Sequence, residues 1–279
     1  MKKITPPKII FPPNKELGQN FLFDKNYLQK IVASCPIDTN TVIVEIGSGY
    51  GSLTNLLAET NCQKVVSLEK DPKLFQWLEQ NNKNGKIAYL HQDALQIDWP
   101  EFCSQYQDSS LIIVGNLPYY ITNTLIINLL FNYHLFKSLV FLVQKEVGQK
   151  WVSSPTKHSA KYSALSVFIN YLAETKITLE VPQGVFTPSP SVDGALVLIE
   201  NNADINIPKE KLFLFLRFLK NCFRFRRKTL LNNLSGFAGN YKTEWEKYFA
   251  ENNFSVKIRP QNLTSTDYWE LFLFWQGFK

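Results

Sequence analysis

The sequence predicts an α/β fold, in which a domain built on a seven-stranded sheet is followed by a small all-helical domain. Between residues 42 and 143, short β-branched segments alternate with segments of helical hydrophobic spacing, a pattern typical of parallel strands joined by crossover helices. After residue 205 the hydrophobic spacing is helical throughout. A chain of 279 residues is long enough to bury such a core and still carry a second domain.

Five strands are expected in the alternating region and two more after it. The segments that follow the first and second strands have hydrophobic residues at helical spacing. These are Leu53, Leu56 and Leu57 after the first strand and Leu74 and Leu78 after the second. A further helix is expected over residues 161–173. The expected strands are residues 41–46, 65–68, 87–90, 111–114, 139–143, 176–180 and 195–200.

The polar segment 201–208 (NNADINIP) separates the two hydrophobic patterns and sets a domain boundary near residue 205. The expected domains are therefore residues 1–205 and 206–279. Thr264 followed by Asp267 resembles a capping box, which predicts the start of the last helix. The basic, proline-containing residues 1–14 are expected to form a mobile arm.

Composition narrows the classes of protein and of site. No apolar stretch approaches the roughly 20 residues of a membrane span, and no signal peptide is recognisable, so a cytoplasmic protein without membrane contact is expected. We also expect a monomer. Four scattered cysteines and three histidines show no metal-ligand spacing, so neither disulfides nor a metal site is expected. The net charge of +6 favours a polyanionic partner such as nucleic acid.

A glycine-rich loop follows the first expected strand. Glu45 precedes Gly47, Gly49 and Gly51, which stand in a G-x-G-x-G pattern. Glycines let the backbone turn sharply and approach a ligand closely. The spacing fits the cofactor loop of S-adenosylmethionine (SAM) methyltransferases better than the G-x-G-x-x-G of dinucleotide-binding proteins. A purely structural turn between strand and helix is the alternative for the loop taken alone.

Polar residues also end the next three strands. Glu69, Asp93 and Asn116 follow Glu45 at intervals of 24, 24 and 23 residues. Because the carboxyl ends of parallel strands meet at one edge of a sheet, these side chains are expected to surround one ligand. Glu69 can accept both hydroxyls of a ribose, and Asp93 can accept a proton from an adenine amino group. Taken singly, Glu69 could instead be an exposed residue before a turn, and Asp93 could be a helix N-cap.

The segment Asn116-Leu117-Pro118-Tyr119 has groups that can bind an amine and a flat base. The Asn116 side-chain oxygen and a backbone carbonyl held before Pro118 can both accept hydrogen bonds from one exocyclic amine. The nitrogen lone pair of that amine then points elsewhere, toward a sulfonium methyl group, and transfer needs mainly orientation. Tyr119 offers a flat face for an unstacked base. The alternative is a proline-terminated strand with a tyrosine in the core.

These residues together resemble the ribosomal small-subunit RNA adenine dimethyltransferase family (KsgA type). The resemblance extends from residue 17 to residue 230, and its landmarks stand in the order of the family. They are residues 17–22 (LGQNFL), 45–54, 69, 93, 116–119 (NLPY), 144–147 (QKEV), 186–193 (FTPSPSVD) and 226–230 (RRKTL).

The resemblance implies a Rossmann-like class I SAM methyltransferase domain that dimethylates N6 of two adjacent adenosines in the 3′-terminal hairpin loop of 16S rRNA, within the pre-30S subunit. It implies that residues 116–119 hold the target adenine and that Phe186 forms a second aromatic wall of the base pocket. The residues that it implies for SAM contact are Asn20, Leu22, Gly47, Glu69, Asp93 and Asn116.

Basic residues gather in the expected C-terminal domain. Between Lys209 and Lys228 there are eight basic residues and one acid, and helical spacing places a basic face opposite an apolar one. Such a face suits a phosphate backbone, although a solvated surface is the alternative. Phe225 stands where the family usually has Gln. The residues expected to contact RNA are Lys220, Arg224, Arg226, Arg227 and Lys228.

Two other functions stay open on the sequence. One is the related enzyme class that dimethylates an adenine of 23S rRNA and confers macrolide resistance, which usually has Ile in place of Leu117. The other is a non-catalytic ribosome-assembly or nucleic-acid-binding factor that keeps the fold. The intact Gly47, Glu69, Asp93 and Asn116 argue against lost catalysis, and a SAM-binding measurement separates the enzyme from the binding factor.

Overall fold

The computed structural model describes residues 9–155, 160–235 and 241–277, so the first eight residues of the expected N-terminal arm lie outside the described part. The chain divides into two compact units. The first comprises residues 1–148 and 175–203, and the second comprises residues 149–174 and 204–279. The second division, after Ala203, lies close to the boundary expected from the polar linker. Residues 149–174 group with the C-terminal helices, however, whereas the sequence places them in the first domain.

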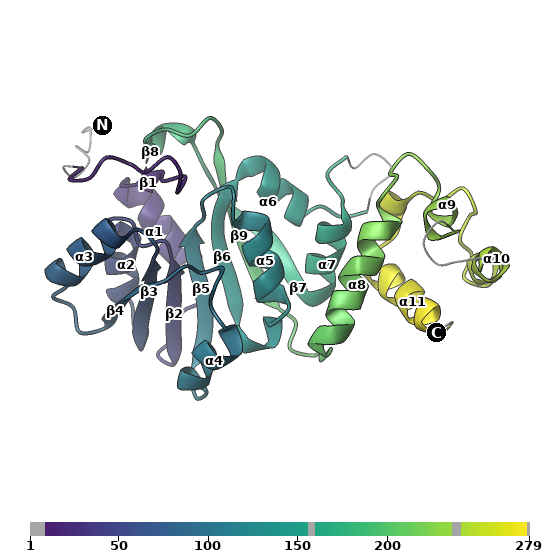
Figure 1. Ribbon diagram of the computed structural model, residues 1–279, viewed down its shortest axis with the longest axis horizontal. Helices are drawn as coiled ribbons and strands as arrows, with labels where there is room; N and C mark the ends of the chain where they lie inside the picture. Colours follow the sequence, from purple (N-terminus) through teal and green to yellow (C-terminus); the bar gives the residue numbers. More distant parts are fainter. Residues whose placement is uncertain (1–8, 156–159, 236–240, 278–279) are drawn as a thin grey trace. The chain divides into compact units, whose positions relative to one another are not determined.

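The first unit is built on a sheet of seven strands in the order β4-β3-β2-β5-β6-β9-β7 (Figure 1). The pairs from β4 through β6 are parallel, and β9 pairs antiparallel with β6. The seven strands predicted from the sequence are therefore confirmed. Their bounds are β2 Thr41–Ile46, β3 Lys64–Glu69, β4 Ile87–His91, β5 Ser110–Asn116, β6 Ser138–Gln144, β7 Ala173–Val181 and β9 Gly194–Asn201.

Helices cover both faces of this sheet. Leu28 and Ile31 of α1 and Leu57 of α2 share one buried cluster with alternate residues of the central strands, such as Ile43 and Ile112. The intervening strand residues point to the other face because side chains alternate along a strand. In Figure 1, α5 lies across the sheet from α1. The helices of this part are α1 Lys25–Ala33, α2 Ser52–Ala58, α3 Pro72–Asn81, α4 Trp99–Cys103, α5 Thr122–Leu130 and α6 Lys145–Trp151.

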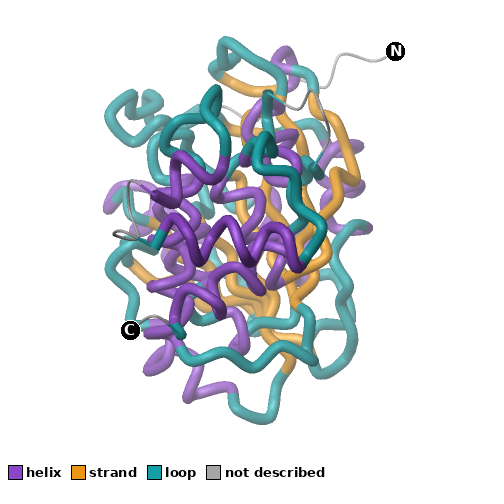
Figure 2. The backbone as a smooth tube through the Cα atoms, turned by 90° about the vertical axis from the view of Figure 1, so that its right-hand side faces the viewer, coloured by secondary structure: helices purple, strands orange, loops and turns teal. Residues whose placement is uncertain are grey.

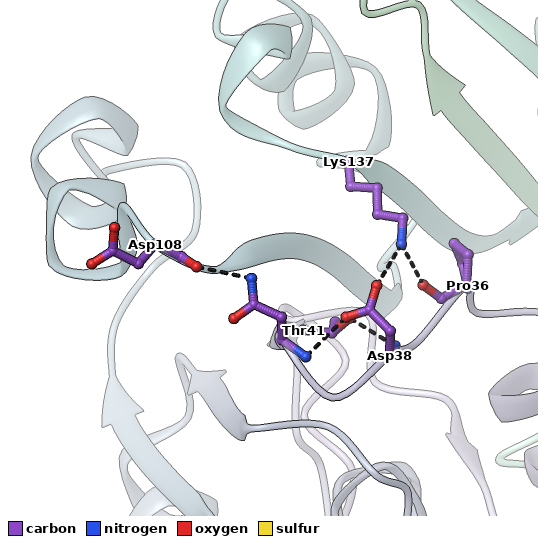
Figure 3. Close-up of polar contacts among 6 residues, drawn as sticks. Pro36, Asp38, Thr41, Asp108 and Lys137 are labelled. Atoms are coloured by element: carbon purple, nitrogen blue, oxygen red, sulfur yellow. Dashed lines mark hydrogen bonds and ion pairs between the residues drawn. The ribbon is translucent and has the colours of Figure 1, made fainter.

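Polar contacts fasten the amino ends of the central strands, at the edge away from the glycine loop (Figure 3). Lys137 Nζ, just before β6, contacts Asp38 Oδ2 at 2.9 Å and donates to the Pro36 carbonyl at 3.2 Å. Asn40 Nδ2 donates to the Asp108 carbonyl at 2.8 Å, which ties the start of β2 to the loop before β5. The Asn40 contact thus links the neighbouring strands β2 and β5, and the Lys137 contacts link the segment before β2 to β6, on the far side of β5.

A second, two-stranded sheet lies outside the main one. β1 (Phe21–Leu22) pairs antiparallel with β8 (Phe186–Thr187), with Leu22 opposite Phe186. From the residues alone, the segment before the first long strand predicts nothing more than the approach to a helix. The segment does lead into α1 at Lys25, but the sequence misses the strand. The pairing joins segments that are about 165 residues apart, and neither has a hydrophobic pattern long enough to indicate a strand.

Apart from Ala173 and Glu174, which begin β7, the described residues of the second unit form helices and connecting segments. Figure 2 colours all helices of the chain purple and all strands orange. The core of the second unit is aromatic. The ring of Phe215 lies 5.0 Å from that of Trp269 and 6.1 Å from that of Phe168, and Tyr171 stacks on Trp269 at 4.8 Å. Because Phe168 and Tyr171 belong to α7, this core explains why residues 149–174 group with the C-terminal helices. The helices are α7 Ala164–Leu172, α8 Lys209–Cys222, α9 Leu230–Ser235, α10 Lys242–Glu251 and α11 Ser265–Gln276.

Local capping explains where two of these helices begin. Thr264 Oγ1 accepts from the Asp267 N–H and the Asp267 side chain accepts from the Thr264 N–H, which confirms the predicted capping box at the start of α11. Ser163 and Ser166 form a second capping box. The helix expected from residue 161 therefore begins at Ala164.

The basic helix expected between Lys209 and Lys228 is shorter than the sequence pattern suggests. α8 ends at Cys222, and the chain continues in turns from Phe223. The apolar face is buried as expected, through Leu212, Phe215, Leu216 and Leu219. Arg224, Arg226, Arg227 and Lys228 therefore lie on a turn and not on a helical stripe, because the chain leaves the helix to enter α9 while the basic sequence continues.

Candidate functional site

A pocket in the first unit lies at the carboxyl ends of β2, β3, β4 and β5. Its walls are the glycine loop, the segments after β4 and β5, residues 17–23 and Phe186. The topology explains this place, because ligands of open α/β sheets bind outside the carboxyl ends of the strands. The pocket brings together every residue expected to contact cofactor or target base: Asn20, Leu22, Gly47, Glu69, Asp93, Asn116, Leu117, Pro118, Tyr119 and Phe186.

The glycine loop adopts a conformation that other residues rarely take. Gly47, Gly49 and Gly51 have φ angles of +82°, +55° and +72°. A Cβ atom at Gly49 would lie only 3.0 Å from the ring of Phe21. Glycine is therefore required both by the backbone angle and by the close approach of residues 17–23.

Glu69, at the end of β3, fixes this loop. Its Oε2 accepts from the Gly49 N–H and its Oε1 from the Asp71 N–H, both at 2.8 Å. Burial raises the pKa of Glu69, and the two N–H donors work against that shift. Each carboxylate oxygen can accept a further hydrogen bond, so the side chain is held in place while it still offers acceptors to a ligand.

Glu45 lies beneath the loop at the end of β2 and is 1% exposed. Its Oε2 accepts from Thr54 Oγ1 and from Ser67 Oγ, each at 2.5 Å, and Ser67 Oγ lies 2.6 Å from Ser48 Oγ. Burial raises the pKa of Glu45 to about 7, and the hydroxyl donors only partly offset this. The buried carboxyl thus joins three chain segments below the pocket floor.

Asp93 forms an ion pair with the residue after Glu69. Lys70 Nζ lies 2.9 Å from Asp93 Oδ2, and the Leu95 N–H donates to Asp93 Oδ1. Burial raises the pKa of Asp93, but Lys70 and the Leu95 N–H outweigh it, so the pKa lies below its ordinary value. Asp93 is therefore ionised at neutral pH and remains a hydrogen-bond acceptor.

Asn116 and Leu117 present two acceptors to the pocket. Asn116 Nδ2 donates to the Asn20 carbonyl at 2.9 Å, so the amide oxygen Oδ1 points to the opposite side. The Leu117 N–H donates to the Leu142 carbonyl. The Pro118 carbonyl accepts from the Ile121 N–H and from Thr122 Oγ1 at the start of α5. Within the described part of the chain, no donor reaches Asn116 Oδ1 or the Leu117 carbonyl.

Three aromatic residues border these acceptors. Tyr119 is 36% exposed, and partial burial raises the pKa of its hydroxyl. Phe186 is buried in the β1–β8 ribbon. Tyr120 is 55% exposed, and its ring lies 3.6 Å from the position of a Cβ atom on Gly18. The sequence gives Tyr120 no role, whereas the structure shows that it packs against the N-terminal segment beside the pocket.

The N-terminal segment is fastened over the glycine loop. Tyr50 Oη accepts from the Phe11 N–H at 2.9 Å and lies 3.0 Å from the Phe11 carbonyl. Gln19 Nε2 donates to Asp71 Oδ2 at 3.0 Å. With the Asn20–Asn116 contact, these bonds hold the N-terminal segment in place, and its residues 17–23 form one wall of the pocket. The sequence indicates this wall only through the family resemblance.

The sequence assigns no role to three residues that the structure places at the site. Glu45 has a place in the loop pattern but no assigned role, and Lys70 and Tyr50 have none either. A usable signal existed for Lys70, because it directly follows the strand-ending Glu69 and so lies at the same edge of the sheet. The expected RNA-contact residues lie in the second unit, where Lys220, Arg224, Arg227 and Lys228 are exposed and Arg226 is half-buried.

Within the described residues, no helix is both long and apolar enough to span a membrane. The same part of the chain contains no group of three or more histidine, cysteine or acidic side chains suited to hold a metal ion.

The chain is similar to known proteins over most of its length. The chain is 36% identical over 260 residues to a protein of Mycoplasma mobile named ribosomal RNA small subunit methyltransferase A, covering 92% of this chain and 96% of that one. A Streptococcus gordonii protein of the same name is 34% identical over 259 residues, covering 91% and 88%.

Two solved structures share the fold at 21% identity. A dimethyladenosine transferase from Plasmodium falciparum superposes with a TM-score of 0.74, covering 92% of this chain and 97% of that one. The 23S rRNA methyltransferase ErmE superposes with a TM-score of 0.70, covering 92% of this chain and 100% of that one. The family model described as ribosomal RNA adenine dimethylase matches residues 10–270. The fold, the pocket and this match over nearly the whole chain show that it belongs to the ribosomal RNA adenine dimethylase family of methyltransferases.

Proposed function

We propose that this protein transfers methyl groups from SAM to N6 of two adjacent adenosines in the 3′-terminal hairpin loop of 16S rRNA, during assembly of the small ribosomal subunit. The observation that carries the proposal is the orientation of Asn116. Because its Nδ2 is held by the Asn20 carbonyl, Oδ1 and the neighbouring Leu117 carbonyl are left as a pair of acceptors. Such a pair suits an exocyclic amine, which has two N–H donors.

The cofactor side of the pocket fits SAM. Glu69 keeps acceptor capacity for the ribose hydroxyls, and ionised Asp93 suits the adenine amino group. Gly47, Gly49 and Gly51, whose positive φ angles favour glycine, present only backbone to the ligand at their positions. Asn20 and Leu22 would close the site from the N-terminal segment, and Asn116 would border it from β5. SAM supplies an electrophilic methyl group on its sulfonium.

The chain's own residues would mainly orient the nucleophile. Hydrogen bonds from the amine to Asn116 Oδ1 and the Leu117 carbonyl direct the nitrogen lone pair away from both acceptors. Tyr119 would hold the flat base, with Phe186 as the opposite wall. Bound SAM would supply the methyl group, and the amine nitrogen that accepts it would lose a proton to solvent. The rate acceleration would come from proximity and orientation of the two reacting groups, so no strong base is needed.

The basic residues of the second unit would bind the RNA backbone. Lys220, Arg224, Arg226, Arg227 and Lys228 bring five positive charges, and neutralising phosphates releases counterions. We place the protein in the cytoplasm, acting as a monomer on the pre-30S subunit. The names of the sequence relatives refer to the small subunit, which favours 16S rRNA over the 23S alternative.

The deciding experiment incubates the protein with labelled SAM and either unmethylated small subunits or large subunits. We expect label on two adjacent adenosines of 16S rRNA and none on 23S rRNA. Label on 23S rRNA would replace the proposal by the first alternative. Absence of SAM binding would replace it by a non-catalytic assembly factor.

A further inference from the structure

An exposed aromatic ring stands among the basic residues that follow α8. Phe225 is 45% exposed, whereas neighbouring Phe223 is buried. Two cations approach the ring, with Arg224 Cζ 5.1 Å and Lys228 Nζ 4.6 Å from its centroid. Cations within about 6 Å of an aromatic face are attracted by its quadrupole. What distinguishes Phe225 from other exposed apolar residues of this unit, such as Phe213 and Leu273, is the pair of cations at its ring.

The backbone holds the ring in this place. Asn233 of α9 is buried, and its Oδ1 accepts from the Phe225 N–H at 2.9 Å. Its Nδ2 donates to the carbonyls of Phe225 at 3.2 Å and Thr229 at 3.0 Å. The Lys228 N–H closes the turn onto the Phe225 carbonyl at 3.0 Å. One buried amide therefore fixes both polar backbone groups of Phe225, so little order remains to be imposed when a ligand binds.

We propose that Phe225, Arg224 and Lys228 form a nucleotide-binding platform, in which an unpaired RNA base stacks on the Phe225 ring while the two cations bind the adjoining phosphates. The inference deepens the proposed function, on which it rests for RNA as the partner. It adds a stacking contact to what the sequence assigns only to positive charges.

The chemistry favours single-stranded RNA over other anionic partners. A phosphate-rich surface without bases would gain from Arg224 and Lys228 but nothing from an exposed phenyl ring. Bases present a flat face to any aromatic ring, and such stacking contributes about 1–3 kcal/mol per base in single-strand binding sites. Base and phosphate recognition within one short turn therefore matches a nucleotide of an RNA loop or strand end.

Salt dependence separates the two parts of the platform. Equilibrium binding to unmethylated small subunits and to a short unstructured RNA is measured at several salt concentrations for wild type, Phe225→Leu, Phe225→Trp and Lys228→Ala. We expect Phe225→Leu to weaken binding about 5- to 150-fold without changing the slope of log K against log salt. Phe225→Trp should bind at least as well as wild type. Lys228→Ala should lower the magnitude of the slope by about one unit.

Leu273→Ala is the matched control, because Leu273 is also an exposed apolar residue of the same unit. It should bind both RNAs like wild type. Unchanged affinity of Phe225→Leu would overturn the platform. A parallel loss of slope in that variant would overturn it too, since Phe225 would then only position the cations. Binding of the short RNA needs no methyl transfer, so the platform can fail or survive independently of the proposed reaction.

Discussion

The Asn116 side-chain amide donates from Nδ2 to the Asn20 carbonyl at 2.9 Å, although the two residues are 96 positions apart in the chain. This bond decides which way the amide faces. It leaves Oδ1 as the free acceptor of the amide and ties the N-terminal segment to the site.

Replacing Asn116 by Ala should therefore remove methyl transfer while leaving SAM affinity within a few-fold of wild type. One of two acceptors for the target amine is lost, and misorientation of a reacting group can cost about 100-fold in rate. Single-turnover methylation of small subunits measures the rate, and calorimetry measures the affinity. Methylation at the wild-type rate would refute the role of Asn116.

Replacing Tyr119 by Ala should lower kcat/KM for small subunits about 5- to 150-fold, because a base-stacking face worth about 1–3 kcal/mol is removed. Tyr119→Phe keeps the ring and serves as the control. We expect that variant to retain most of the activity. Equal losses in the two variants would mean that the hydroxyl, and not the ring, is what matters.

Replacing Glu69 by Gln should weaken SAM binding. A Gln side chain has one oxygen, so either the Gly49 or the Asp71 N–H would face an amide NH₂ and lose its acceptor, at a cost of about 1–3 kcal/mol. Titration with SAM measures the effect. Glu180→Gln is a suitable control, because Glu180 is exposed and pairs with Lys145 at the surface. SAM affinity that is the same in both variants would argue against Glu69 as a cofactor contact.

Glu45 should make stability depend on pH in an unusual direction. Burial raises its pKa from the ordinary 4.5 to about 7. Between these values the folded protein binds a proton that the unfolded chain has lost, so the free energy of unfolding falls as pH rises. Glu45 alone contributes a decrease of roughly 3 kcal/mol from below pH 4.5 to above pH 7.

Urea unfolding of wild type and Glu45→Gln from pH 4 to 8 measures this contribution. Gln cannot ionise, so the difference between the two proteins should shift in favour of the variant as pH rises. Parallel stability curves would show that Glu45 has an ordinary pKa in the folded protein.

Gly115 and Gly85 form a matched pair for packing beside the site. A Cβ atom at Gly115 would lie 2.8 Å from the Ile46 carbonyl oxygen, whereas one at Gly85 would have nothing within 4 Å. Gly115→Ala should lower the free energy of unfolding by about 1–3 kcal/mol because β2 and β5 must separate. Gly85→Ala should leave it unchanged or slightly raised. Chemical denaturation of both variants tests this, and equal stability would contradict the close contact.

Much of the main sheet could be predicted because its signals are local. The strands are short runs rich in apolar and β-branched residues, and a polar residue stands at or just after the carboxyl end of β3, β4 and β5. Glu69, Asp93 and Asn116 could be assigned to one edge since parallel strands all end there. The end of α8 at Cys222 could not be predicted, because a helical pattern continues through Arg224 and only the path into α9 stops it.

The sequence by itself determined the chemistry of this protein: the glycine loop, the acids at the strand ends, the Asn-Leu-Pro-Tyr segment and the basic residues before α9. Tertiary structure decided which of these polar groups and rings face the pocket and which are already paired with other residues. It set the direction of the Asn116 amide, paired Lys70 with Asp93, and placed Phe186 opposite Leu22. The physical reason is that a residue's type fixes what its side chain can donate or accept. Which of these bonds it makes depends on segments that only folding brings together.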